Sequence, residues 1–593
     1  MTLGRMADVC GGIYYGREED RDREVCAITT DSRKAEPGCL FAAIKGERVD
    51  GHDFVGQVFG KGALCVIGEQ EPEFLCSSQG VPVGQRASDD SDALTDVKNG
   101  IGNSGKTAGS FSDAGDGARM GNYIKVESTI KALGDLAAYY LEQLSIPVVG
   151  ITGSVGKTST KEMVAAVLSQ KYRTLKTAGN FNNELGLPLT IFRLREEDQI
   201  AVLEMGINHF GEMHNLARIA KPDTCVITNI GQCHLEFLGD RDGVLRAKTE
   251  IFDFLRPDGH IILNGDDDKL ASVEAVEVPA RAGTQSERAT ETGDDPRWAD
   301  VSEQAAGICE KNVLHLTKTA GLGTCGNSDA GEIDSSRKLR PTFFGFGQEN
   351  DIYADHIVKK GLDGIECRIC VAGKAFEAQT AKRLPSDDSK NTGDSHTMAE
   401  NQNSAEPVTA FTVQIPIPGI HMVMNALAAT AVGLHYGLTF DEIRAGIESL
   451  QPVSGRFHII HTEQFTIIDD CYNANPMSMK ASLEVLQDGL GRKVAILGDM
   501  GELGGEEEQM HRGVGEAAGG MDIDLCICVG PLSAQIAAGV NAVNAGMPTV
   551  TLPNLQTLLA QLGSLVKKGD TILVKASHFM HFEKVVAKLE EMG

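Results

Sequence analysis

The chain has 593 residues and is 41% hydrophobic, a length and composition that indicate roughly three to five globular domains. Its formal charge is −28, with 83 acidic against 55 basic residues, which argues against a general nucleic-acid binder because phosphate affinity needs clustered Lys and Arg. A small anionic substrate remains compatible with this charge, since helix N-termini, lysines and Mg²⁺ can hold one locally.

The first region, residues 1–83, contains short apolar runs such as LFAAI and ALCVIG that predict strands. Residues from about 84 to 121 are rich in Gly, Ser and Asp and lack apolar periodicity, so we expect a mobile insertion there. Two further segments, about 276–341 and 378–407, have the same character. A small lid over a binding site is the alternative for all three segments.

One match to the strict phosphate-loop spacing G-x-x-x-x-G-K-T lies inside the first of these segments, at Gly100–Thr107 (GIGNSGKT). No apolar strand precedes it and no amphipathic helical pattern follows it. We therefore interpret this match, which includes Lys106, as a chance occurrence in a glycine-rich stretch.

A second glycine-rich stretch, Gly150–Thr160 (GITGSVGKTST), misses the strict spacing by one position but has the right surroundings. A predicted helix over 125–144 leads into the apolar run 146–149, and the apolar residues Met163, Val164, Val167 and Leu168 share one face of the helix that follows. A strand, a glycine-rich turn and a helix cradle phosphates with backbone N–H groups. Lys157 would meet the phosphates and Thr158 would reach Mg²⁺, in a loop completed by Gly153, Ser154, Gly156 and Ser159.

Further strands are predicted at AVLEMG, TCVITNIG and HIILNGDD, separated mostly by helical stretches, so the fold class is α/β with a mostly parallel sheet. Polar residues follow these strands at Glu204, Asn229, His234 and Asn264. Ligands bind at the carboxyl ends of strands in open α/β sheets. Three such turns beside a phosphate loop therefore predict a nucleotide site.

The individual residues leave alternatives open. Glu204 is suited to supply a carboxylate to the metal, or it is a solvated loop acid. His234 is a metal ligand or a surface or capping histidine. Lys248, in VLRAKTEIF, is by its spacing alone a solvated helix lysine paired with a nearby acid.

After about residue 453 a second α/β series begins, with FTIIDDCY, KVAILGDMG, LCICVG and DTILVKAS. The 14 cysteines form no dense framework, and Cys225, Cys526 and Cys528 fall in strand-like runs that predict buried thiols. Cys367 and Cys370 make a single C-x-x-C, for which chance placement in a strand is favoured over a metal site. With neither a leader-like N-terminus nor a membrane-spanning run, we expect a reduced, cytoplasmic protein.

Together the motifs resemble the Mur ligase family. Its phosphate loop, metal-side and nucleotide-side segments are matched by GITGSVGKTST, TAGNFNNELGLPLT (177–190), AVLEMGINHFGEM (201–213), TNIGQCHLEFLG (228–239), AKTEIF (247–252), LNGDD (263–267), PGIHMVMNALAATA (418–431) and SGRF (454–457). DDCYNANPMSMKASL (469–483) and LGDMGELG (497–504) are similar to the member that uses D-alanyl-D-alanine, and TDSRKAEPGCLFAAIKGERVDGHDF (30–54) to its UDP-substrate domain.

The resemblance implies an architecture and a reaction. It implies an amino-terminal UDP-substrate domain over 1–145, a central P-loop ATPase domain over 146–452, and a Rossmann-like ligase domain over 453–593. It implies ATP and two Mg²⁺ ions as cofactors. The implied partners are UDP-N-acetylmuramoyl-tripeptide and D-alanyl-D-alanine, joined through an acyl phosphate by a monomer in peptidoglycan precursor synthesis, with no nucleic acid and no membrane span.

The resemblance also implies roles for single residues. Lys157 and Thr158 match phosphate-loop positions, Glu204 and His234 match metal ligands, and Lys248 matches a lysine that family members carbamylate to hold a second Mg²⁺. Matches to nucleotide-lining positions are Asn264, Asn425, Arg456 and Asp470. On the substrate side the matches are Asn180, Asn183, Tyr472 and Asn473, together with Ser32 and Arg33 at the uridine-contacting turn, which by themselves would be an ordinary surface turn.

One segment departs from the family. Where the family usually has KGSR, this chain has Lys575-Ala576-Ser577-His578, so a role for this loop is in doubt. The alternatives to the implied activity are a sibling ligase that adds a single amino acid, a folylpolyglutamate synthase-like enzyme, and a non-enzymatic nucleotide-gated switch. The motifs YNANP and DSR…DGHDF argue against the first two alternatives. The predicted metal ligands at the strand ends argue against the third alternative. The third residue of the tripeptide is not specified by these motifs.

Overall fold

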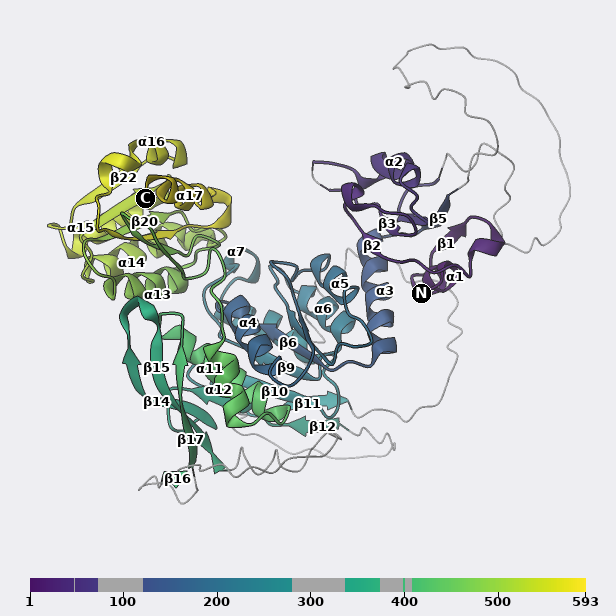
Figure 1. Cartoon of the computed structure of the whole chain (residues 1–593), viewed down its shortest axis with the longest axis horizontal. Helices are drawn as coiled ribbons and strands as arrows, with labels where there is room; N and C mark the ends of the chain where they lie inside the picture. The colour runs from purple at the N-terminus through teal and green to yellow at the C-terminus, as the bar shows by residue number, and fades with distance from the viewer. Residues whose placement is uncertain (47, 73–120, 280–335, 374–397, 400–407) are drawn as a thin grey trace, which may run out of the picture. The chain divides into compact units, whose positions relative to one another are not determined.

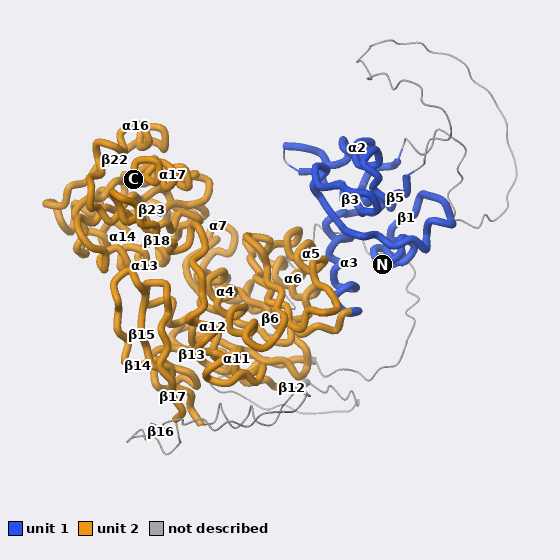
Figure 2. Tube along the Cα trace, in the orientation of Figure 1, with its two compact units in different colours: residues 1–143 blue, residues 144–593 orange. Residues whose placement is uncertain are grey.

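The computed structural model describes residues 1–46, 48–72, 121–279, 336–373, 398–399 and 408–593 (Figure 1). These residues form two compact units, Met1–Gln143 and Leu144–Gly593 (Figure 2). The strict match Gly100–Thr107 and most of the three expected insertions lie outside the described residues. The division into three domains stays a prediction, although three large sheets occur in succession along the chain.

The first unit contains a five-stranded sheet in the order β1-β5-β4-β3-β2. Only the β1–β5 pair is antiparallel. The core under this sheet includes Phe41, Val58, Val66 and Tyr123. The elements are α1 (Leu3–Val9), β1 (Ile13–Tyr15), β2 (Ile28–Thr29), β3 (Leu40–Ala42), α2 (Val55–Gly60), β4 (Cys65–Gly68), β5 (Asn122–Lys125) and α3 (Thr129–Leu144).

The predicted helix over 125–144 is wrong at its start. Asn122–Lys125 form β5, paired with both β1 and β4, and α3 begins at Thr129. The hydroxyl of Ser128 accepts a hydrogen bond from the N–H of Lys131 at 3.3 Å, as expected of a residue that caps a helix. Backbone pairing across the sheet therefore takes Lys125 out of the predicted helix, and residues 126–128 connect β5 to α3.

The second unit begins with a ten-stranded sheet in the order β16-β17-β15-β14-β13-β10-β9-β6-β8-β7. Along this order, the neighbouring strands β14, β13, β10, β9, β6, β8 and β7 are all parallel to one another, which confirms the predicted α/β class. Each expected strand is present. The parallel strands are β6 (Val148–Thr152), β7 (Thr174–Lys176), β8 (Ile200–Glu204), β9 (Thr224–Ile227), β10 (His260–Asn264), β13 (Thr342–Gly345) and β14 (Ile352–Lys359).

Helices pack on this sheet through apolar faces. Met163, Val164, Val167 and Leu168 are all fully buried, and α4 packs against α11 and α12. Because α4 is buried in this way, the loop that precedes it is held firmly at the sheet edge. The helices are α4 (Lys157–Leu168), α5 (Gly186–Ile191), α6 (Glu212–Ala220), α7 (Leu235–Leu238), α8 (Arg241–Thr249), α11 (His421–His435) and α12 (Phe440–Glu448).

The far edge of the ten-stranded sheet is antiparallel, through β15 (Ile365–Ala372), β17 (Val408–Ile415) and the short β16 (Met398–Ala399). Cys367 and Cys370 both lie buried in β15, as expected for chance placement in a strand. Parts of two of the segments expected to be mobile insertions form paired strands, because β16 pairs with β17 and β11 (Val276–Pro279) pairs with β12 (Ser336–Leu339).

A six-stranded sheet follows, in the order β18-β19-β23-β20-β21-β22, with only β18 antiparallel. Cys526 and Cys528 are buried in β21, as predicted. None of the helices in the described ranges combines the length and apolar character needed to cross a bilayer. The elements are β18 (His458–His461), β19 (Thr466–Asp469), α13 (Pro476–Gln487), β20 (Lys493–Gly498), α14 (Glu507–Gly519), β21 (Leu525–Val529), α15 (Ser533–Val543), β22 (Thr549–Leu552), α16 (Leu555–Leu565), β23 (Thr571–Lys575) and α17 (Glu583–Met592).

Candidate active site

The loop between β6 and α4 has the conformation of a phosphate cradle. Gly153 has φ +147°, and a Cβ there would lie 1.9 Å from Thr228 Oγ1, so no other residue fits. Asn229, at the end of β9, braces the loop, because its carbonyl accepts from Ser154 N at 3.0 Å and its side-chain Oδ1 accepts from Val155 N at 2.9 Å. The neighbouring strand end therefore holds the loop open for an anion.

The start of α4 meets the end of β8. Thr158 Oγ1 donates to Glu204 Oε1 at 3.1 Å, and Asn182 Nδ2 donates to the same oxygen at 2.8 Å. Glu204 is 1% exposed, its Oε2 accepts no hydrogen bond, and the ammonium of Lys161 lies 3.7 Å from that oxygen. The structure thus brings Thr158 and Glu204 together, as predicted, and excludes the alternative that Glu204 is a solvated loop acid.

Lys248, on α8, is completely buried, and its Nζ has no hydrogen-bond partner. Burial lowers the pKa of Lys248 to about 8, opposed by the Cys233 thiol and reinforced by the positive charge of Lys157. Lys157 Nζ donates to Gly153 O at 2.8 Å, and burial lowers its pKa as well. The solvated, ion-paired lysine that spacing alone favoured is therefore wrong for Lys248.

His234 lies at the N-terminus of α7 with φ +52°. Its Nδ1 is 2.6 Å from Oε2 of Glu502, which belongs to the loop after β20. This hydrogen bond lowers the pKa of Glu502. His234 is not free at the surface, since its side chain is 19% exposed.

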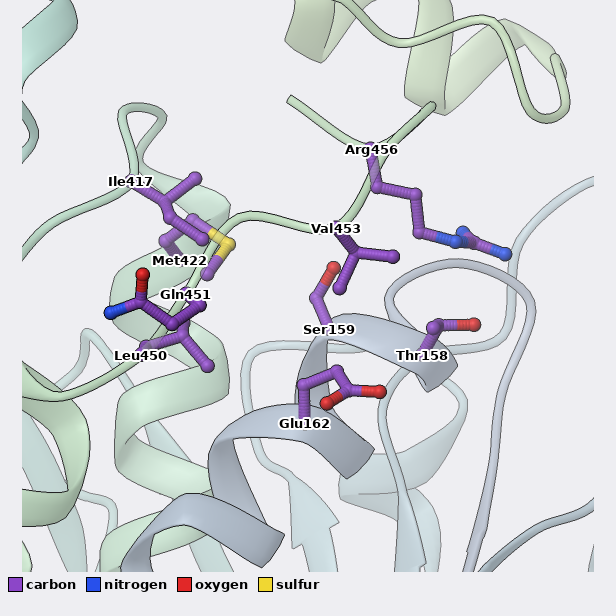
Figure 3. A pocket seen from close by; sticks show the side chains of 9 residues that line it. All are labelled: Thr158, Ser159, Glu162, Ile417, Met422, Leu450, Gln451, Val453 and Arg456. Carbon is purple, nitrogen blue, oxygen red and sulfur yellow. The ribbon is translucent and has the colours of Figure 1, made fainter. Parts of the chain in front are cut away.

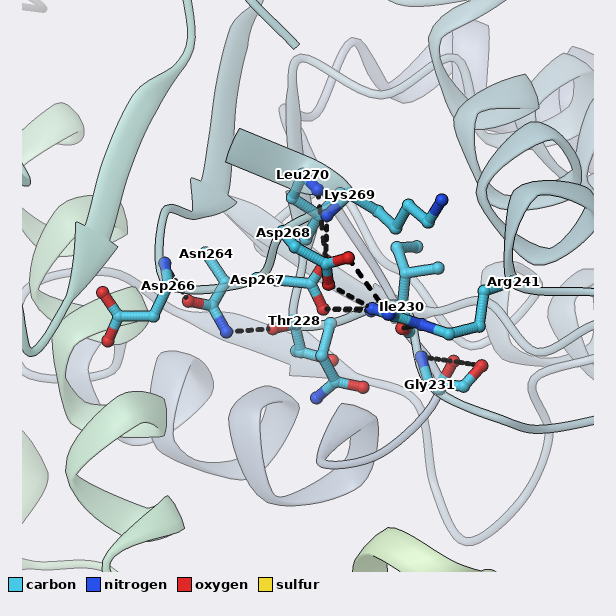
Figure 4. A network of polar contacts seen from close by, with 12 residues as sticks. Thr228, Ile230, Gly231, Arg241, Asn264, Asp266, Asp267, Asp268, Lys269 and Leu270 are labelled. Atoms are coloured by element: carbon cyan, nitrogen blue, oxygen red, sulfur yellow. Dashed lines mark hydrogen bonds and ion pairs between the residues drawn. The ribbon is translucent and has the colours of Figure 1, made fainter. Parts of the chain in front are cut away.

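The strand end at Asn264 is tied into a polar network (Figure 4). Asn264 Nδ2 donates to Thr228 O at 3.0 Å, and its Oδ1 accepts from Asp266 N at 3.0 Å. Asp267 Oδ2 accepts from Ile230 N at 2.8 Å. The side chain of Asn264 thus binds two neighbouring loops and stiffens the edge where a nucleotide would lie.

A small pocket beside the phosphate loop is lined by residues of α4, of α11 and of the segment that leads to β18 (Figure 3). Thr158 and Ser159 from α4 and Arg456 from the segment before β18 contribute to it. The Arg456 guanidinium lies 4.2 Å from the centroid of the Tyr472 ring. Asn425, on α11, is nearby, since it accepts from Thr160 Oγ1 at 2.9 Å and its Oδ1 would lie 3.4 Å from a Cβ at Gly156.

The end of β19 carries a buried ion pair. Asp470 Oδ2 is 2.5 Å from Lys575 Nζ and accepts from Ser482 Oγ at 2.6 Å. Lys575 also donates to Asn473 O at 3.0 Å, and the exposed Asn473 side chain accepts from Ala474 N. The His578 ring, where the family has Arg, is 5.5 Å from the Tyr472 ring centroid to centroid.

Four predicted substrate residues lie at exposed turns. Asn180 and Asn183 are exposed on either side of Asn182, and Asn183 Oδ1 accepts from Gly186 N at 2.9 Å at the start of α5. In the first unit, Ser32 and Arg33 form a 3₁₀ turn whose carbonyls accept from Lys61 Nζ. Hydrogen bonds from Arg33 lower the pKa of Asp31 to about 2.

Three family models match the sequence. The Mur ligase family catalytic domain matches residues 24–97, the Mur ligase middle domain 151–310, and the Mur ligase glutamate ligase domain 455–578. The UDP-N-acetylmuramoyl-tripeptide--D-alanyl-D-alanine ligase of Bacillus subtilis is 32% identical, covering 100% of this chain and 98% of the relative. The Escherichia coli ligase of the same name is also 32% identical, with coverage of 100% and 99%.

The chain belongs to the Mur ligase family. A crystal structure of MurF from Acinetobacter baumannii, 27% identical, has a TM-score of 0.70 and covers 100% of this chain and 98% of that one. The sheets described for this Mur ligase therefore have the fold of a solved family member.

The residues of this Mur ligase fit a divalent metal at the end of β8. Glu204 Oε2 and Lys248 Nζ are two buried polar atoms without a hydrogen-bond partner. Glu204 bonds to the Thr158 hydroxyl, and Lys248 is close enough to Lys157 of the phosphate loop for their charges to interact. Among the described residues, no cluster of three or more His, Cys, Asp or Glu side chains is placed to hold a metal. His, Cys, Asp and Glu side chains of the described residues therefore form no complete set of metal ligands by themselves.

Several residues that contact the predicted site residues of this Mur ligase were not predicted from the sequence. Asn182 and Lys161 contact Glu204, Lys575 neutralises Asp470, and Glu502 bonds to His234. Asn182 stands between the two predicted asparagines, so the NFNNE pattern was an available signal. The other contacts join distant segments and leave no local signal.

Proposed function

We propose that this chain is an ATP-dependent amide ligase that joins D-alanyl-D-alanine to UDP-N-acetylmuramoyl-tripeptide in peptidoglycan precursor synthesis. The observation that carries the proposal is the phosphate loop before α4, with the buried carboxylate of Glu204 and the unpartnered amine of Lys248 beside it. The full-length identity with ligases of that name supports the choice of substrates. The free cysteines of the described part suit a reducing compartment such as the cytoplasm.

Lys248 is the proposed site of a carbamate. An amine whose pKa is about 8 is partly neutral near pH 7, and its free electron pair can attack CO₂ with release of one proton. The product carries an anionic oxygen in place of a cation. Such an oxygen, with Glu204, Thr158 and His234, would hold Mg²⁺, which supplies charge neutralisation at the phosphates when bound.

The protein contributes to this reaction mainly by positioning the substrates and by neutralising charge. The tripeptide carboxylate is a poor electrophile, so it takes the γ-phosphoryl group of ATP to form an acyl phosphate. The amine of D-alanyl-D-alanine attacks the carbonyl, phosphate leaves with the electron pair of the C–O bond, and the amine loses a proton. We assign to this role Lys157, whose ammonium bonds within the phosphate loop, and Arg456, which lines the pocket beside it.

The remaining predicted residues are proposed to shape the substrate sites. Asn264 and Asp470 use their side chains inside the protein, so we assign them to the walls around the nucleotide, with Asn425. Tyr472 and Asn473 are proposed for the dipeptide side. The exposed turns of Ser32 and Arg33, and of Asn180 and Asn183, are proposed for the UDP-linked substrate.

A substrate-omission assay tests the proposal. Phosphate release is measured with ATP and Mg²⁺, omitting UDP-N-acetylmuramoyl-tripeptide and D-alanyl-D-alanine in turn. We expect release only when both are present, and an amide product by mass spectrometry. Equal turnover without the dipeptide would contradict the ligase, and turnover with a single amino acid in its place would favour a sibling ligase.

A further inference from the structure

One hydrogen bond in the second unit joins its two large sheets next to the proposed metal site. Glu502 lies in the loop between β20 of the six-stranded sheet and the 3₁₀ turn Gly504–Glu506. Its Oε2 is 2.6 Å from Nδ1 of His234, which follows β9 of the ten-stranded sheet. No other hydrogen bond of the His234 ring occurs within the described ranges, so Nε2 is left for another partner.

The backbone at both ends of this bond is held in an uncommon conformation. Seven non-glycine residues of the described chain have positive φ, and His234 (+52°) and Glu502 (+61°) are two of them. Such conformations persist for non-glycine residues only where the surroundings impose them, and they cluster at functional sites. The fold therefore fixes the backbone conformation of both residues, independently of the hydrogen bond between their side chains.

The loop that carries Glu502 also packs closely on α7. A Cβ at Gly504 would lie 3.4 Å from Cα of Glu236, so the backbones of the loop and of α7 are in near contact. Leu503, next to Glu502, is 2% exposed and anchors the loop in the core. The carboxylate is thus presented to His234 from a rigid support, although its own side chain is 49% exposed.

We propose that Glu502 is a positioning residue for the metal site: its carboxylate accepts a hydrogen bond from Nδ1–H of His234 and so directs the Nε2 electron pair toward Mg²⁺. This inference rests on the proposed function, in which His234 holds Mg²⁺. Metal-binding histidines generally donate their other ring N–H to a carboxylate or carbonyl, which fixes the tautomer and raises the basicity of the ligand. Glu502 supplies that carboxylate from the other sheet.

The arrangement has a consequence for coupling within the enzyme. His234 and Glu502 are 268 residues apart in the chain and come from different sheets. The histidine is oriented for metal only when the loop after β20 packs on α7. Contact between the two sheets and completion of the metal site are therefore linked by this single bond.

Metal binding to the full-length chain tests the inference. Mn²⁺ binding in the presence of ADP is measured from the free-ion signal in electron paramagnetic resonance, for the wild type, His234→Ala, Glu502→Ala and Glu502→Gln. We expect Glu502→Ala to weaken the affected Mn²⁺ site about tenfold, and Glu502→Gln, which keeps an acceptor but loses the charge, to weaken it less. Glu506→Ala removes an exposed acid from the 3₁₀ turn that follows this loop and serves as the matched control, with no change expected.

A second readout follows the histidine itself. In ¹⁵N-histidine-labelled protein, the His234 ring should carry its proton on Nδ1 in the wild type and in Glu502→Gln, and shift toward the Nε2-protonated tautomer in Glu502→Ala. A purely structural role for Glu502 would lower the melting temperature without moving the tautomer or the Mn²⁺ affinity, and would overturn the inference. If His234→Ala itself leaves Mn²⁺ binding unchanged, the metal role proposed for His234 is wrong, whereas loss in His234→Ala without loss in Glu502→Ala rejects only the positioning role.

Discussion

The ten-stranded and six-stranded sheets of the second unit each have a carboxylate at a strand end and a buried lysine, but the contacts of these groups differ. In the ten-stranded sheet the carboxylate is Glu204 at the end of β8 and the lysine is Lys248 on α8, whereas in the six-stranded sheet Asp470 follows β19 and Lys575 ends β23. In the six-stranded sheet, Asp470 and Lys575 lie 2.5 Å apart and satisfy each other. In the ten-stranded sheet, Glu204 has an oxygen without a hydrogen bond, and Lys248 has no hydrogen-bond partner.

Burial is alike in the two regions, since Lys248 is 0% and Lys575 2% exposed. What differs is the partner of the lysine: Lys575 bonds to Asp470, whereas Lys248 has no hydrogen-bond partner and Glu204 pairs at 3.7 Å with another lysine, Lys161. A buried charge without a partner is costly unless a ligand or a chemical change offsets it. The comparison therefore separates a structural ion pair, which holds the β19 end in place, from a site prepared for metal. Burial alone would not have distinguished them.

The comparison assumes that phosphate chemistry belongs to the ten-stranded sheet. Lys157→Ala should lower turnover by at least about 10³-fold, because it removes a cation from the transferring phosphoryl group. Lys106→Ala, in the strict match outside the described residues, should leave turnover near the wild-type value in the same phosphate-release assay. The reverse pattern would move the phosphate site to Gly100–Thr107 and break the comparison.

Removing the unpaired lysine should affect catalysis far more than folding. Lys248→Ala should lose about 10³-fold in turnover, since the proposed oxygen ligand of the metal is lost. Short carboxylates such as formate or acetate should restore part of the activity by entering the vacated space. Lys248→Arg, which cannot be carbamylated and fills the space, is the control for rescue, and an equal response of the two variants to carboxylates would argue against the carbamate.

Removing Lys575, the lysine paired with Asp470, should lower the free energy of unfolding. Lys575→Met leaves the Asp470 carboxylate buried without its cation, so urea unfolding should show a loss of about 3–5 kcal/mol. The double variant Asp470→Asn/Lys575→Met should recover most of this, because no charge is left buried. Lys248→Met should not be destabilising in the same assay. A similar loss in Lys248→Met and Lys575→Met would mean that the two lysines have the same role.

The pH dependence of stability sharpens the same contrast. The pKa of Lys248 is about 8 in the folded chain against an ordinary value of 10.5, so between these pH values the unfolded state binds a proton that the folded state has released. The free energy of unfolding of the wild type, relative to Lys248→Met, should therefore rise by about 3 kcal/mol from pH 7.5 to pH 10.5. Urea unfolding in metal-free, CO₂-free buffer measures this, and no rise would show that the amine is not desolvated.

The sequence was sufficient for what depends on local pattern. Strand periodicity followed by a glycine-rich turn placed Lys157 and Thr158, and the strand-end rule placed Glu204 at the same edge. It was insufficient where distant segments meet. Lys575 lies 105 residues from Asp470 and Glu502 lies 268 from His234, so neither partner has a local signal.

The burial of Lys248 and its lack of a hydrogen-bond partner also could not be predicted from the periodicity of the sequence. In the sequence it is a polar residue on a short helix, and only the packing of α8 in the folded chain buries its amine and removes its partners. The wrong start of α3 has a similar origin, since Lys125 is held in β5, which pairs with two strands, and α3 begins only at Thr129. Tertiary contacts decide both cases.

The smallest effect is expected where the ten-stranded sheet partly satisfies its own carboxylate. Asn182→Ala removes the donor 2.8 Å from Glu204 Oε1 but leaves Thr158 bonded to the same oxygen, so turnover at limiting Mg²⁺ should fall about tenfold. Saturating Mg²⁺ should recover most of it, because the metal can reorient a carboxylate that has lost one of two donors. Asn180→Ala, at the exposed neighbouring position, should leave the Mg²⁺ dependence unchanged. A loss in Asn182→Ala that Mg²⁺ does not correct would place Asn182 with the substrate rather than with the metal carboxylate.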